Sequence, residues 1–284
     1  FTPEFLTIYF PVIVKMALAV IFPIVVMSGI PVLVWLERRG AGFMQDRPGP
    51  NRSNIFGFTF LGLLHPINDA IKMVMKENFA PAKARLFFYY LAPAIVVIPA
   101  ILTFAVIPVG APVETGQVKI PLQIATLDSG ILYLLAISSL GVYGLVIGGW
   151  ASGNKYSLLG AIRSASQMLS YEVTLGISLV TIFMIYSAVE PSQIVERQGG
   201  LIFGVIPNWG IFLSPVAFIL FLVSSYAESN RTPFDLPEAD SEIVAGYHLE
   251  YGALKFAMFM MAEYISMITM SAIVVTMFFG GYQI

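Results

Sequence analysis

The residues with the clearest chemical potential are carboxylates inside or beside strongly apolar segments. Glu172 and Glu263 lie within such segments, and Glu228 ends another. A charged side chain within a membrane costs roughly 3 kcal/mol or more, and such residues usually mark an ion or proton path. Arg163 and Lys255 are candidate pairing partners, and static hydrogen bonding between helices would explain either buried glutamate alone. Because three such acids occur in one chain, we favour a path of carboxylates that take up and release protons.

The segment 228–250 is the densest acidic cluster of the sequence and holds a single arginine, Arg231. Pro233 and Pro237 prevent a continuous helix through it. Crowded carboxylates raise one another's pKa, which suits exchange of protons. We therefore interpret the segment as a polar loop that extends the path, although a solvated connector is the simpler alternative. The loop acids that we assign to the proton path are Asp235, Glu238, Asp240 and Glu242.

A second polar segment, 35–52, is basic and rich in glycine and proline, so we expect it to attract the acidic loop. The segment 55–77 shows a helical repeat with apolar residues on one face and polar residues on the other, which predicts a surface amphipathic helix. Together these three segments would enclose a cavity with an apolar wall and a few polar groups. Such a cavity fits a lipid-soluble ligand with a polar head. His65 is expected to face solvent or a partner.

The remaining sequence must position these groups in a membrane. Of 284 residues, 57% are hydrophobic and 11% are charged, and the mean hydropathy is +0.82. We predict an all-α, polytopic helical membrane protein with one integral domain over 1–284. Cysteine is absent, which excludes disulfides and thiolate-held iron–sulfur clusters in this chain. The six expected spans are 9–36, 86–109, 129–150, 158–186, 209–227 and 252–280.

Lysine and arginine fall almost entirely on one side of these spans, which predicts that side to be cytoplasmic. The acidic loop and the amphipathic helix are then cytoplasmic and the N-terminus lies outside. The basic residues follow this topology, so the sequence offers no support for nucleic-acid binding. We found no repeat of the kind that builds secondary transporters.

Four motifs carry a family resemblance. The stretches ERRGAGFMQDRPGPNR, GLLHPINDAIKMVMKE, GWASGNKYSLLGAIRSASQMLSYE and ESNRTPFDLPEADSEIVAGYHLEYGALKFAMFMMAEY resemble the family of H subunits of proton-pumping NADH:quinone oxidoreductases, respiratory complex I. The resemblance implies a membrane-arm subunit that helps to form the quinone chamber and starts a line of proton-carrying carboxylates. By motif, Glu172, Glu228 and Glu263 match the family's intramembrane and junctional glutamates. The residues implied in quinone binding are Trp35, Arg38, Arg39, Phe234 and Arg231.

The resemblance also implies partners and a location. Quinone is the expected substrate, whereas iron–sulfur clusters and flavin are expected only in other subunits of the complex. We expect a multi-pass protein of the bacterial inner membrane, in contact with lipid and with subunits of both arms. Members of the family usually have eight spans, so the family's C-terminal spans are expected to be missing here. Alternatives are a related subunit of a membrane-bound hydrogenase, a secondary ion transporter and a purely structural anchor.

Overall fold

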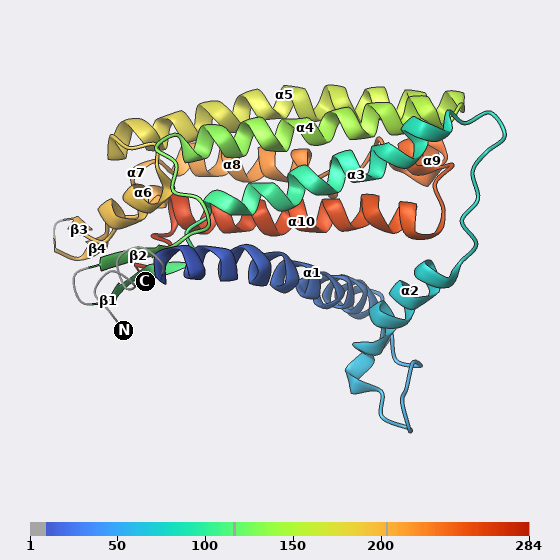
Figure 1. Ribbon diagram of the computed structural model, residues 1–284, viewed down its shortest axis with the longest axis horizontal. Coiled ribbons are helices and arrows are strands. Elements are labelled where there is room, and N and C mark those ends of the chain that lie inside the picture. The colour runs from blue at the N-terminus through green and yellow to red at the C-terminus, as the bar shows by residue number, and fades with distance from the viewer. Residues whose placement is uncertain (1–9, 116–117, 203, 284) are drawn as a thin grey trace.

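The computed structural model describes residues 10–115, 118–202 and 204–283, and the side chains of all of these except 114, 115, 118 and 240. Five helices in this part of the chain are long and apolar enough to cross a membrane. They are α1 (Phe10–Met44), α3 (Leu86–Leu102), α4 (Gly130–Ala151), α5 (Lys155–Tyr186) and α10 (Ala253–Phe278). The long axes of these helices run along the molecule as one bundle (Figure 1). The predicted helical membrane fold is confirmed.

The span expected at 209–227 differs in form from the others. It consists of the short helix α7 (Gly210–Leu213) and the 14-residue helix α8 (Pro215–Glu228). Ser214 between them has φ −142° and ψ 72°, outside the helical region. A residue before proline is disfavoured in the α conformation, because the proline ring clashes with its backbone. Pro215 therefore interrupts this span, whereas α1 continues through Pro23 and Pro31.

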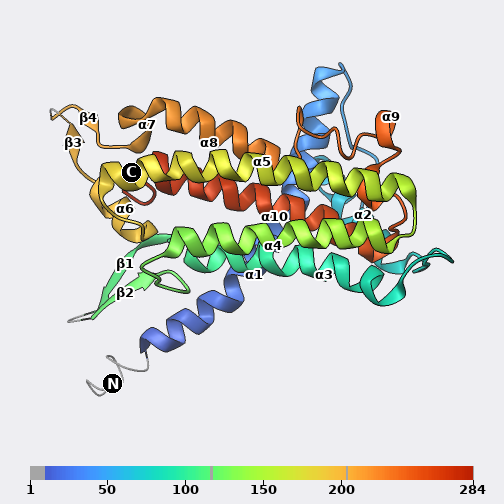
Figure 2. The same cartoon turned by 90° about the horizontal axis from the view of Figure 1, so that it is seen from above.

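The bundle packs through small residues on α4. A Cβ added at Gly144 would lie 2.4 Å from Val96 on α3, and one added at Gly149 would lie 2.4 Å from Ala161 on α5. Glycine at these positions allows the three helices to approach closely, as in other membrane helix pairs. Helices α3, α4 and α5 consequently form one side of the bundle, with α8 against α5 and α10 against α3 (Figures 1 and 2).

The polar connections gather at the two ends of the bundle. One end carries the 3-10 turns η2 (Phe60–Gly62) and η4 (Gly246–His248) with the helices α2 (Leu64–Met75) and α9 (Asp240–Ile243). We call it the α2/α9 end. The opposite end carries helix α6 (Pro191–Gln198) and two hairpins (Figure 1). The hairpin strands are β1 (Gly110–Thr115), β2 (Val118–Leu122), β3 (Leu201–Ile202) and β4 (Ile206–Pro207). α3 is followed by the 3-10 turn η3 (Thr103–Val106).

The amphipathic helix is shorter than expected. Helical structure covers 64–75 of the predicted 55–77, because the residues before it form 3-10 and bridge geometry with positive φ at Phe56, Phe60 and Leu61. The apolar face is nevertheless present and exposed, with Ile71 53% and Val74 67% accessible. An exposed apolar face beside a membrane domain is typical of a helix that lies on lipid or on another subunit.

Two buried apolar clusters stabilise the bundle. The larger one lies towards the opposite end and includes Leu179, Phe221 and Met270. The smaller one lies at the α2/α9 end and includes Tyr89, Tyr247 and Phe259. Polar side chains separate the two clusters, and the candidate site is found there.

Candidate functional site

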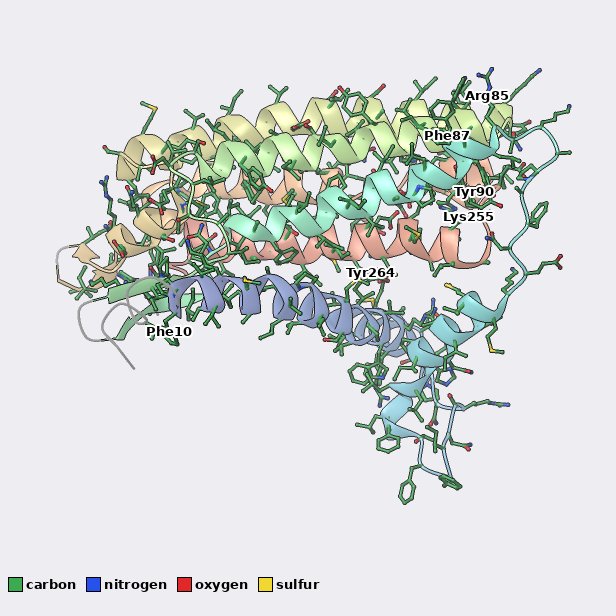
Figure 3. The ribbon with its side chains drawn as sticks, in the orientation of Figure 1. Phe10, Arg85, Phe87, Tyr90, Lys255 and Tyr264 are labelled. Atoms are coloured by element: carbon green, nitrogen blue, oxygen red, sulfur yellow. The ribbon has the colours of Figure 1, made fainter. Side chains whose placement is uncertain are left out.

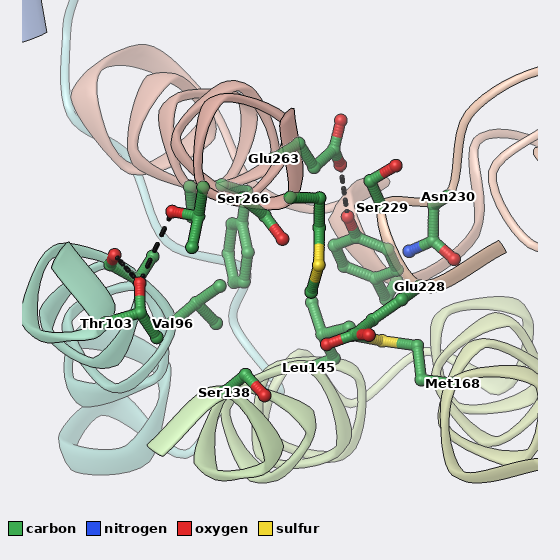
Figure 4. Close-up of a pocket in the computed structure, with 17 residues that line it drawn as sticks. Val96, Thr103, Ser138, Leu145, Met168, Glu228, Ser229, Asn230, Glu263 and Ser266 are labelled. Carbon is green, nitrogen blue, oxygen red and sulfur yellow. Dashed lines mark hydrogen bonds between the residues drawn. The ribbon is translucent and has the colours of Figure 1, made fainter. Parts of the chain in front are cut away.

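A small cavity of about 60 Å³ lies between the two apolar clusters, among α3, α4, α8 and α10. Glu228 enters it from the end of α8 and Glu263 from α10 (Figure 4). Its other polar lining includes Ser138 and Thr103, whose hydroxyl lies 3.3 Å from that of Thr269. The volume accommodates a few water molecules, and the polar groups supply hydrogen-bond partners for them. The structure thus brings together two of the three glutamates that the sequence singled out.

Glu228 is deeply buried and incompletely paired. Its side chain is 6% exposed, and its Oε2 atom has no hydrogen-bond partner within the described ranges. Glu172 on α5 is half-buried and close enough to Glu228 for electrostatic repulsion, although it does not line the cavity. A buried carboxyl without a partner is costly as an anion, so protonation or water must compensate it.

The polar face of α5 fixes the loop that leaves α8. The amide of Gln167 donates to the carbonyl oxygens of Ala227 at 3.0 Å and Phe234 at 2.8 Å. Asn230 donates to the Ser164 hydroxyl at 3.1 Å. The polar face of α5 therefore holds the acidic loop against the bundle, since these bonds satisfy backbone groups that no regular element pairs.

The loop joins the cavity through one tyrosine. The Tyr247 hydroxyl lies 2.7 Å from Glu263 Oε1 and 3.0 Å from Glu238 Oε1. Burial raises the pKa of Glu238 above its usual value and raises the pKa of Tyr247 well above its usual value. Glu238, which we predicted as part of the path, thereby contacts the intramembrane Glu263 through a neutral phenol.

Two other predicted loop acids, Glu242 and Asp235, take no part in this contact. Glu242 is exposed and lies 3.4 Å from the guanidinium of Arg163. Asp235 is half-buried, and the side chain of Asp240 falls outside the described residues. Lys255 donates to the carbonyl of Phe79 at 3.0 Å.

The expected cations for the intramembrane glutamates are therefore wrong. Arg163 pairs with Glu242 of the loop. The ammonium of Lys255 lies over the rings of Tyr89 and Tyr90, and Figure 3 shows Lys255 and Tyr90 near the end of the bundle. Lys255 is the third residue of α10 and Arg163 is the ninth residue of α5, and nearby connecting segments supply their partners. The sequence spacing carried no information on these loop contacts.

The candidate quinone residues fall into two groups. Trp35 Nε1 and Arg39 both donate to the carbonyl of Leu61, at 3.0 Å and 2.6 Å, while Arg38 pairs with Asp69 of α2. These bonds hold α2 and the preceding turn against the end of α1. A cavity of about 420 Å³ lies beside them, between α2 and the start of α10. It is lined by Arg38, Asp69, Lys72, Met73, Tyr251 and Phe256, among others.

The second group centres on Arg231. Its guanidinium lies 3.2 Å from the Glu37 carboxylate of α1 and 4.3 Å from the centre of the Tyr264 ring. Its Nε and Nη2 atoms are buried and have no partner in the described part of the chain. Phe234 packs edge-on against Tyr171, with ring centres 5.3 Å apart. Among the candidate quinone-binding residues, Arg231 thus has N–H groups without a partner in the described residues. Trp35 and Arg39 instead donate to the backbone carbonyl of Leu61.

The expected attraction between the two polar segments takes an unexpected form. The two segments are joined by an ion pair between Glu37 and Arg231. The acidic partner, Glu37, belongs to the basic segment 35–52, and the basic partner, Arg231, belongs to the acidic loop. The Tyr264 hydroxyl also donates to Glu37 at 2.6 Å. Sequence analysis did not select Glu37, Tyr247 or Tyr264. Only their positions in the sequence could have indicated two of these residues. Tyr264 directly follows Glu263, and Glu37 directly precedes Arg38 and Arg39.

His65 is half-buried and accepts hydrogen bonds from its own chain. Its Nε2 atom accepts the backbone N–H groups of Arg52 and Ser53, each at 3.0 Å. A neutral imidazole with one accepting nitrogen suits this position, and it anchors the irregular segment before α2. Within the described residues, no group of three or more His, Asp or Glu side chains is arranged to hold a metal ion.

Comparison with known proteins adds an independent finding. The family model described as NADH dehydrogenase matches residues 16–284. The chain is similar to the second of the NADH-quinone oxidoreductase H subunits of Geobacter sulfurreducens, with 48% identity over 266 residues that cover 94% of this chain and 77% of that protein. It is 46% identical to the H subunit of Leptospira biflexa over 270 residues, which cover 92% of this chain and 72% of the relative. The H subunit of Bdellovibrio bacteriovorus is 42% identical over 287 residues, with 94% and 73% covered.

Proposed function

This chain belongs to the NADH dehydrogenase family, and we propose that it is the membrane subunit of an NADH–quinone oxidoreductase that couples quinone reduction to proton translocation. It would act within the larger complex, since the chain holds no thiolate for an iron–sulfur cluster. The observation that carries the proposal is the contact between the loop acid Glu238, the phenol of Tyr247 and the intramembrane Glu263. It connects the polar α2/α9 end to a cavity inside the bundle.

We assign the quinone to the α2/α9 end of the bundle. The cavity beside Arg38 has an apolar wall from Met73 and Phe256 together with charged groups, as a lipid-soluble ring with polar oxygens requires. The free donors of Arg231 would serve an acceptor such as a quinone carbonyl oxygen. Trp35 and Arg39 support this region through Leu61, and Phe234 supports it through Tyr171.

The carboxylates would carry changes in protonation from the quinone region into the membrane. Reduction of a quinone consumes protons and changes the charge at the α2/α9 end. The loop acids, with Glu238 first, would change their protonation in answer, and Glu263 and Glu228 would follow across the shared cavity. Glu172, Asp235, Asp240 and Glu242 are retained in the proposed path. Glu172, Asp235 and Glu242 take no part in the Tyr247 contact, so their effects should be smaller than those of Glu238 and Glu263.

The location and partners follow from the same assignment. The α2/α9 end would face the cytoplasm in a bacterial inner membrane, with the N-terminus outside, because nearly all lysines and arginines flank that end. Subunits of the redox arm, which would hold the flavin and the iron–sulfur clusters, would cover the same end. The exposed apolar face of α2 would lie on lipid or on one of these subunits. The names of the relatives do not favour the hydrogenase-type or transporter alternatives.

The test uses the assembled complex in closed membrane vesicles. Glu263→Gln and Glu228→Gln should assemble and lower the number of protons moved per NADH oxidised. Thr126→Ser, a mild change at the opposite end, serves as the control and should pump normally. Full proton pumping in the Glu228→Gln/Glu263→Gln double variant would refute the proposed path. Normal quinone reduction in an Arg231→Gln variant would refute the assigned role of that arginine.

A further inference from the structure

Three oxygen atoms meet at Tyr247, and they cannot all be paired without an extra proton. The phenol lies within hydrogen-bond distance of Glu238 and of Glu263, at 3.0 Å and 2.7 Å. A tyrosine hydroxyl carries one hydrogen, and ionised carboxylates only accept. If both glutamates were ionised, one of them would face the phenolic oxygen with no hydrogen between the two atoms. The geometry therefore requires one of the two carboxyls to carry a proton.

The surroundings favour neutral groups over charged ones. Tyr247 is fully buried, and its ring packs against Phe259 with ring centres 5.4 Å apart. The charged or titratable groups that face this contact are few. The positive charge of Arg231 acts on both carboxyls, Glu228 shares the cavity with Tyr247, and the His248 ring lies 5.2 Å from that of Tyr247. A single cation close to two acids favours one carboxylate and one neutral carboxyl.

We propose that Tyr247 is a proton-relay residue that passes a proton between Glu238 of the loop and Glu263 of α10. This inference rests on the proposed function and adds a residue to it. In the forward step, neutral Glu238 donates its proton to the Tyr247 oxygen while the Tyr247 hydroxyl donates its own proton to ionised Glu263. One O–H bond forms and one breaks at the phenol, so tyrosine stays neutral. Glu238 ends as the carboxylate and Glu263 as the acid, with no electrons exchanged.

The reset step needs a rotation of the phenol O–H bond and a new proton on Glu238. After transfer, the tyrosine hydrogen points to Glu238, and Glu263 passes its proton into the cavity that it shares with Glu228. Rotation of the O–H bond and uptake of a proton by Glu238 from the loop side then restore the starting arrangement. The cavity lining does not include Glu238. The phenol bridges Glu238 to Glu263, and the two carboxyls also interact directly with one another.

The experiment compares Tyr247→Phe with Tyr186→Phe in the assembled complex. Both changes remove one hydroxyl from a buried tyrosine. The Tyr186 hydroxyl lies at the opposite end of the bundle and donates to the Asn208 carbonyl at 2.8 Å. A positioned proton-transfer group typically contributes about 10²- to 10⁴-fold. Since water partly replaces a hydroxyl, we expect Tyr247→Phe to slow proton pumping by about tenfold or more. Its deuterium solvent isotope effect should change, and Tyr186→Phe should pump normally.

An infrared measurement on the unmodified complex gives a test that does not depend on the folding of a variant. The relay requires a carboxylic acid C=O band near neutral pH that disappears in Glu238→Gln or in Glu263→Gln. Absence of such a band in the native complex would overturn the inference. Unchanged pumping and isotope effect in Tyr247→Phe would overturn it as well. If Glu263→Gln abolishes pumping while Tyr247→Phe does not, the relay fails and the proposed function stands; if neither variant affects pumping, the proposed function fails too.

Discussion

The guanidinium of Arg231 lies 3.2 Å from the carboxylate of Glu37, although 194 positions separate the two residues in the chain. This ion pair joins the end of α1 to the loop after α8. The Tyr264 hydroxyl binds the same carboxylate, and its ring lies under the guanidinium. Because Tyr264 is adjacent to Glu263, this one contact connects the proposed quinone region to the proposed proton path.

The free donors of Arg231 predict a selective effect on quinone binding. Arg231→Gln removes the Nε and Nη2 atoms that have no partner in the described residues, so the Michaelis constant for quinone should rise. Glu37→Gln removes the partner but leaves these donors, and its effect should be smaller. The Glu37 side chain is 54% exposed, so a double-mutant cycle on unfolding should give a coupling below about 1 kcal/mol. Equal Michaelis constants in both variants would contradict this role.

The buried Glu238 predicts a pH-dependent gain in stability for its amide variant. Burial raises the pKa of Glu238, so the folded state binds this proton more tightly than the unfolded state. The protein therefore loses stability as pH rises from the ordinary glutamate value of about 4.3 through the raised value. Glu238→Gln removes that loss, and its unfolding midpoint relative to wild type should increase as the pH rises above the ordinary glutamate pKa. Glu242→Gln, at an exposed acid of the same loop, is the control.

Lys255 predicts a structural requirement at the start of α10. This lysine is 5% exposed, its Nζ atom lies 4.3 Å from the centre of the Tyr89 ring, and it donates to the Phe79 carbonyl. Lys255→Met should destabilise the protein by about 1–3 kcal/mol, because a desolvated cation–π contact and a charged hydrogen bond are lost together. Protease cleavage between 76 and 85 should accelerate. The exposed Lys155→Met should change neither measurement.

Two glycines on α5 predict opposite tolerance to alanine. A Cβ at Gly160 would lie 2.6 Å from Gly246 Cα and 2.9 Å from the Tyr247 nitrogen, whereas a Cβ at Gly176 meets nothing within 4 Å. Gly160→Ala should cost about 1–3 kcal/mol by overpacking and should displace Tyr247 from its glutamates. Slower pumping and a lower unfolding temperature would appear together. Gly176→Ala should leave both unchanged, and similar losses in the two variants would argue against this packing.

Local sequence determined the elements and the types of chemistry. Long apolar runs predicted six spans, since only helices satisfy backbone hydrogen bonds within lipid, and the described residues contain five helices long and apolar enough to cross a membrane. The placement of Glu228 and Glu263 at or within apolar helices predicted acids inside the bundle, whereas the interruption of the remaining span at Pro215 was not predicted. The predicted features depend on residues near one another in the chain, so composition and spacing were sufficient.

Tertiary packing decided which of these groups meet. Arg163 and Lys255 were reasonable partners for buried glutamates by spacing, but the first pairs with Glu242 and the second with the Phe79 carbonyl. Tyr247 gave no signal in the sequence, because its role arises only where the loop folds back and places the phenol between Glu238 and Glu263. Hydrogen bonds act over about 3 Å, whereas sequence patterns specify only which face of an element a residue occupies. The distances between faces of different elements, and therefore the proposed proton path, are set by how the helices and the loop pack.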